Sequence, residues 1–101
     1  MRALEDIEAS FLKVKSSARA ALVGDDAAKD EALQDIFGLN NEIGMLARQR
    51  PETMPKMREL QGYVNMITVG IKYARKKDLV EGLSVVEKTI KRMKREISSG
   101  S

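Results

Sequence analysis

Apolar residues recur at alternating intervals of three and four in four stretches of this chain, and that pattern restricts the fold more than any other feature. Such intervals place the apolar side chains on one face of an α-helix, whereas a half-buried strand requires alternation of period two. Sustained alternation of period two does not occur. The sequence therefore predicts an all-α protein.

The interruptions of the pattern predict where the helices begin and end. We expect helices at about 3–23, 26–49, 54–77 and 79–97, separated by Gly24, by the stretch with Pro51 and Pro55, and by a corner at Asp78. Glycine closes helices, the residue before a proline disfavours helical geometry, and aspartate caps a new helix. Four helices of similar length with short connections favour antiparallel neighbours. The predicted fold is a four-helix antiparallel up-and-down bundle.

The expected core consists of the apolar stripes of these helices. In chain order they are Leu4, Ile7, Phe11, Val14, Ala18 and Ala21; Ala32, Ile36, Leu39, Ile43 and Leu46; Met57, Leu60, Val64, Ile67, Ile71 and Ala74; and Leu83, Val86, Ile90, Met93 and Ile97. A chain of 101 residues suffices for one modest core. We therefore expect a single domain over residues 1–97 and a disordered tail over residues 98–101.

The composition argues against most catalytic chemistry. The chain contains no cysteine and no histidine, so it lacks thiolate nucleophiles and the usual zinc ligands and neutral-pH acid–base groups. Nucleotide-binding and metalloprotease motifs are absent as well. The acidic group from Asp25 to Asp35 is typical of residues at a helix start rather than of a calcium loop. We expect a protein that is not an enzyme and has no cofactor. No apolar run reaches the ~20 residues of a membrane span, so a cytoplasmic location is expected.

The predicted third helix carries a second apolar stripe. Gly62, Met66, Val69 and Tyr73 follow one another at intervals of four, three and four, about 180° from Val64 and Ile67. From Leu60 to Lys77 there is no Asp or Glu. A helix that is apolar on two faces is usually covered on both. Three interpretations follow: the helix is central within one chain, it forms a homodimer, or it binds another protein.

The second helix shows a milder version of the same feature, because Leu33, Phe37 and Gly44 widen its apolar arc.

Basic residues form a second candidate surface. Lys88, Lys91, Arg92 and Arg95 lie opposite the apolar stripe of the fourth helix, and Arg48, Arg50, Lys56 and Arg58 surround the two prolines. In an antiparallel bundle, Arg92 and Arg95 lie at the same end as the proline corner. The cations suit a solvated face, nucleic acid or an acidic partner, and those near the corner also suit a helix C-terminus.

Charge is unevenly distributed along the chain. Residues 1–44 carry five Lys/Arg and nine Asp/Glu, a net charge of −4, whereas residues 45–101 carry thirteen and six, a net charge of +7. The two halves can attract one another within one fold.

These observations favour a small, non-enzymatic protein–protein interaction module, an adaptor or regulatory subunit, that forms a homodimer through the second stripe of the third helix. The alternative is a nucleic-acid-binding accessory protein that uses the basic residues.

Overall fold

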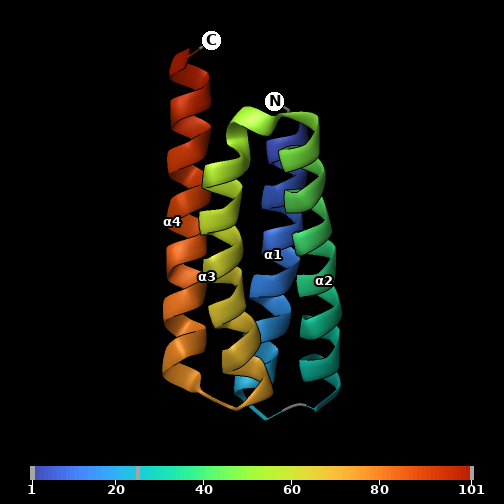
Figure 1. Ribbon diagram of the computed structural model, residues 1–101. Helices are drawn as coiled ribbons and strands as arrows, with labels where there is room; N and C mark the ends of the chain where they lie inside the picture. Colours follow the sequence, from blue (N-terminus) through green and yellow to red (C-terminus); the bar gives the residue numbers. More distant parts are fainter. Residues whose placement is uncertain (1, 25, 101) are drawn as a thin grey trace.

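Four α-helices account for nearly the whole structure, a computed structural model that describes residues 2–24 and 26–100, with side chains for 4–24 and 26–96. They are α1 (Arg2–Leu22), α2 (Asp26–Gln49), α3 (Met54–Lys72) and α4 (Lys76–Gly100). Consecutive helices run in opposite directions and form an elongated bundle of 43 × 20 × 18 Å (Figure 1). Strands are absent from the described residues. The predicted all-α bundle is confirmed.

The core lies along the bundle axis and is almost wholly aliphatic. Phe11 is its one aromatic side chain among the described residues, and Ile7, Leu39, Leu60 and Ile67 are fully buried around it. Each such side chain contributes about 1.5–3 kcal/mol of transfer free energy when buried. The expected core residues are buried with two described exceptions, since Ala21 is half-buried and Ala74 is exposed. The side chain of Ile97 lies outside the described residues.

The first two breaks follow the sequence pattern. Gly24 has a φ of 90°, the left-handed conformation that ends a helix. Asp26 is already the first residue of α2, and Asp25 lies outside the described residues. After α2, Pro51–Thr53 form a 3₁₀ turn in which the Thr53 N–H donates to the Arg50 carbonyl at 2.9 Å. Pro55 then stands in the first turn of α3, where its missing N–H costs no helical hydrogen bond.

The corner between α3 and α4 differs from the prediction. The sequence predicts a third helix that continues to residue 77 and an Asp78 cap on a helix from 79, but α3 ends at Lys72 and α4 begins at Lys76. Ala74 has a φ of 54°, and the Arg75 N–H donates to the Gly70 carbonyl at 2.9 Å. This is the hydrogen bond of a Schellman motif, in which Ala74 occupies the left-handed position that glycine usually takes. Ala74 therefore lies in the turn, and Asp78 lies in the first turn of α4.

The end of α4 also differs from the prediction. The helix continues through Gly100 instead of ending near residue 97, so residues 98–100 of the expected disordered tail are helical. Ser101 lies outside the described residues. The start of α1 and the end of α4 lie at the same end of the bundle, where α4 extends beyond its neighbours (Figure 1).

Two glycines bring α3 and α4 into close contact. A Cβ added to Gly70 would lie 2.7 Å from the Leu79 Cβ and 2.7 Å from the Leu79 nitrogen. A Cβ added to Gly82 would lie 2.9 Å from Cγ1 of Ile67. Real Cβ atoms do not tolerate such distances, so the two helices approach as closely as they do because these positions lack side chains. Their contact fixes which side of α3 faces outward.

Polar contacts join α1 to its two neighbours. Ser17 donates to the Asp35 carboxylate of α2 at 2.5 Å, and Lys15 donates to Glu87 of α4 at 3.1 Å. Lys94 of α4 also donates to Glu8 at 3.0 Å. The α1–α4 seam is the least tightly packed of the four seams between adjacent helices.

Candidate interaction surfaces

The second stripe of α3 is only partly covered by its own chain. Met66 is half-buried, because Gly82 lets α4 approach so closely that an added Cβ would lie 3.3 Å from the Met66 Cβ. Val69 is 36% exposed, Tyr73 is 69% exposed and Gly62 is exposed. These values exclude the interpretation in which α3 is covered on every side within one chain. They leave an outward apolar face on α3.

A shallow trough runs along this face. Its walls are Gly62, Asn65, Met66, Val69 and Asp78, and its volume is about 290 Å³. A Cβ added to Gly62 would meet no atom within 4 Å, so the space above that residue is open. Tyr73 lies one turn beyond Val69 and extends the stripe, since its N–H still donates to the Val69 carbonyl at 3.0 Å.

Phe37 forms a separate apolar projection on α2. Its side chain is 70% exposed, whereas Leu33, one turn earlier, packs partly against the core. A Cβ added to Gly44 would meet nothing within 4 Å. The sequence indicated a widened apolar arc here, but only the structure shows that Phe37 itself remains uncovered.

Half of the predicted basic residues form ion pairs. Arg92 lies 3.3 Å from Glu59, Lys91 lies 3.6 Å from Glu87, and Arg50 lies 3.7 Å from Glu52. Lys56 contacts Glu96, which holds the pKa of that carboxyl below its ordinary value. Arg48, Arg58, Lys88 and Arg95 make no ion pair with the residues that the structure describes. The basic surface is therefore partly neutralised by its own acids.

The contacts of Glu59 place the basic residues of α3 and α4 together. Its carboxylate accepts from Arg92 at 3.3 Å and from the Tyr63 hydroxyl at 3.0 Å. The hydrogen bond to Glu59 raises the pKa of Tyr63 above its ordinary value. With the Lys56–Glu96 pair, this shows that the start of α3 and the later part of α4 share one end of the bundle.

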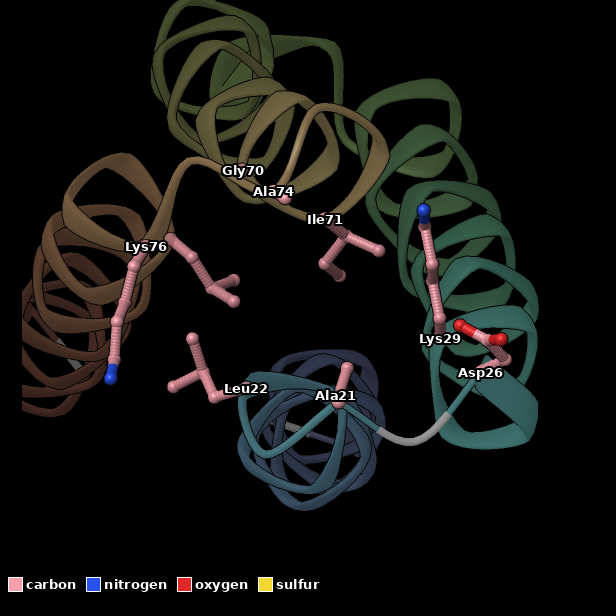
Figure 2. Close-up of a pocket in the computed structure, with 10 residues that line it drawn as sticks. Ala21, Leu22, Asp26, Lys29, Gly70, Ile71, Ala74 and Lys76 are labelled. Carbon is pink, nitrogen blue, oxygen red and sulfur yellow. The ribbon is translucent and has the colours of Figure 1, made fainter.

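The opposite end of the bundle contains a cavity that the sequence did not predict. It has a volume of about 270 Å³ and is lined by residues of all four helices and by Gly24 and Ala74 of the two corners. Leu22 and Ile71 point into the opening, while the ammonium groups of Lys29 and Lys76 point away from its centre (Figure 2). Its walls combine aliphatic side chains with the charged residues Asp26, Lys29 and Lys76. A smaller groove of about 130 Å³ lies along the α1–α4 seam beside Leu12, which is 55% exposed.

Metal binding finds no support in the described residues. Among them there is no group of three or more acidic residues arranged to hold a metal ion. Every buried side-chain nitrogen or oxygen in that part of the chain has a hydrogen-bond partner. Within the same residues, no helix has the length and apolarity needed to cross a membrane.

No family model, curated protein or solved structure matches the chain. The features of its surface are therefore the basis for inferring its function.

Proposed function

We propose that this protein is a small helical protein–protein interaction module, an adaptor or regulatory subunit, that self-associates through the outward face of α3. The face consists of Gly62, Met66, Val69 and Tyr73. The proposal rests chiefly on the exposure of Val69 and Tyr73, 36% and 69%, on the same side of one helix. Covering them would remove apolar area from water at about 25 cal/mol per Å².

The composition of the face is more typical of a protein–protein interface than of a solvent-exposed surface. Tyrosine and methionine are enriched where proteins meet, and charged residues are depleted at the centre of such contacts. The stripe has this composition, since it contains Met66 and Tyr73 and none of its four residues is charged. The half-buried Met66 gives the trough an adaptable wall, and the open space above Gly62 leaves room for a side chain from outside.

The basic residues support the alternative less well. Four of the eight are engaged by acids of the same chain, and no exposed aromatic residue lies among Lys88, Lys91, Arg92 and Arg95 to stack on bases. Nucleic-acid binding is therefore retained as the alternative that the experiment must distinguish.

The test is the solution mass of the protein over a concentration series at low and high salt, measured for the native chain and for Tyr73→Glu. We expect a dimer that persists at high salt, because apolar association does not weaken with added salt. Removing an exposed aromatic residue and adding a charge should weaken the dimer by about 2 kcal/mol, roughly thirtyfold in dissociation constant.

Val23→Glu is the control, since Val23, which directly follows α1, is 85% exposed and gains the same charge. It should leave the dimer intact. A folded native chain that stays monomeric at every concentration contradicts self-association. Salt-sensitive binding of DNA or RNA that is lost in Lys88→Glu would support the alternative.

A further inference from the structure

The outer side of α2 bears a row of residues that matches the α3 face. Asp26, Asp30, Leu33, Phe37 and Gly44 fall within about 60° of one another around the helix. This row lies well away from the buried Leu39 and Leu46. It begins with two acids, has Phe37 at its middle and ends at a glycine.

Phe37 lies at the same height in the bundle as the trough on α3. Lys29 and Ile71 line the same end cavity, so these residues of α2 and α3 share one level. The two helices are antiparallel, so counting forward along α2 and backward along α3 moves in the same direction. Eight residues on from Lys29 is Phe37, and eight residues back from Ile71 is Tyr63, each about 12 Å from the starting level. Phe37 is therefore level with the part of the trough between Gly62 and Met66. Both point outward from one molecule and cannot meet within it.

We propose that the occupant of the α3 face is α2 of a second copy of this chain. A two-fold axis parallel to the bundle places Phe37 of each copy in the trough of the other, so the contact is made twice. This inference depends on the self-association proposed above and specifies its geometry. It differs from a contact of α3 with the partner's α3, in which Phe37 would stay exposed.

Charge complementarity supports this partner. Asp26, Asp30 and Lys72 are exposed, and none of them makes an ion pair with a residue that the structure describes. By the same count along the antiparallel helices, Asp30 is level with Gly70 and Asp26 with Ala74, on either side of Lys72. The two-fold axis brings these acids opposite the partner's Lys72. A contact between two α3 faces would instead leave Asp26 and Asp30 of α2 outside the interface.

The same arrangement limits the size of the contact. At the other end of this side of the bundle, Arg48 of one copy would face Arg58 of the other, and the two cations repel one another. The copies therefore diverge there, as helices that pack at an angle do. Half of a side measuring 43 by 20 Å is about 430 Å² per partner, or about 860 Å² in total, which is below the standard size and in the range of weak, transient contacts. The expected dimer is weak and reversible.

Charge reversal tests the pairing. Asp30→Lys and Lys72→Asp should each weaken the dimer about tenfold, since each turns two attractions into repulsions. An equimolar mixture of the two variants should recover native affinity. In a mixed dimer the lysine introduced at position 30 faces the aspartate introduced at position 72, and the unchanged Lys72 of one copy faces the unchanged Asp30 of the other. Glu31→Lys is the matched control: it makes the same charge change one residue away, pointing off the row, and should not alter affinity. Circular dichroism verifies the helical content of each variant.

The outcomes separate this inference from the function on which it rests. If Lys72→Asp strengthens the dimer and Asp30→Lys has no effect, the α2–α3 pairing is wrong while self-association stands. If the mixture remains as weak as the single variants, the pairing is also wrong. If the native chain is monomeric at all concentrations, both proposals fail.

Discussion

The close approach of α3 and α4 predicts that Gly70→Ala destabilises the protein. The added methyl group would lie 2.7 Å from the Leu79 Cβ and nitrogen and 2.8 Å from its Cα. Because two of these atoms belong to the backbone of α4, no rotamer change relieves the contact. The helix must therefore shift, which loosens the packing of Leu79 and of Gly82 against Ile67.

The magnitude follows from two opposing effects. Overpacking of this kind costs about 1–3 kcal/mol, while replacing a helical glycine by alanine gains up to about 1 kcal/mol. We expect a net loss of about 1–2 kcal/mol, or a fall in Tm of about 5–15 °C for a domain of this size. Thermal unfolding followed by circular dichroism measures it.

Gly38→Ala is the matched control, because an added Cβ there meets nothing within 4 Å. This variant should gain up to about 1 kcal/mol from helix propensity alone. A Gly70→Ala protein as stable as Gly38→Ala would show that α3 and α4 are not in this close contact, and the reasoning about the outward face of α3 would lose its basis.

Two further changes test the corner and the α1–α4 seam. Ala74→Gly should raise the free energy of unfolding by about 1 kcal/mol in urea denaturation, because Ala74 has a φ of 54° that glycine adopts without strain; an unchanged or lower value would contradict the strained turn. The hydrogen bond from Lys15 holds the pKa of Glu87 below its ordinary value of 4.5, so the native state binds this proton less readily than the unfolded state does. The pair therefore stabilises the fold by about 0.5–1 kcal/mol above that pH and stops doing so as the pH falls through the native pKa. Glu87→Gln should lose this increment at pH 7 and show a shallower decline of stability on acidification, and an unaltered pH profile would argue against the pair.

Much of the fold could be predicted because each core stripe is a local pattern. Most buried residues of α1 and α2 follow from spacing alone, and the prolines mark the corner before α3. Ser17 and Ala28 are buried outside the expected stripes. The third corner was misplaced because its turn uses Ala74 in a left-handed conformation, where sequence patterns lead one to expect glycine. The hydrogen bond from the Arg75 N–H to the Gly70 carbonyl closes this turn, and it depends on a backbone conformation that the residue types there do not predict.

The candidate surface could be predicted only in part. The spacing of Met66, Val69 and Tyr73 indicated a second apolar face, but spacing does not show how much of it the neighbouring helix covers. That depends on Gly82, which lets α4 cover part of Met66 and leaves Tyr73 uncovered. The end cavity was not predicted, because it is formed by residues from four helices whose association is purely tertiary.

The arrangement of the seams also bears on how the chain folds. Three of the four seams join helices that are consecutive in the sequence, and only the α1–α4 seam joins distant segments. Helical proteins with such local contacts cross low entropic barriers and fold in microseconds to milliseconds. The Lys15–Glu87 and Glu8–Lys94 pairs close the longest loops, of 72 and 86 residues, so they are expected to form after the two helical hairpins have docked. We therefore expect the closure of this charged seam to be the last event of folding and its release to be the first step of unfolding.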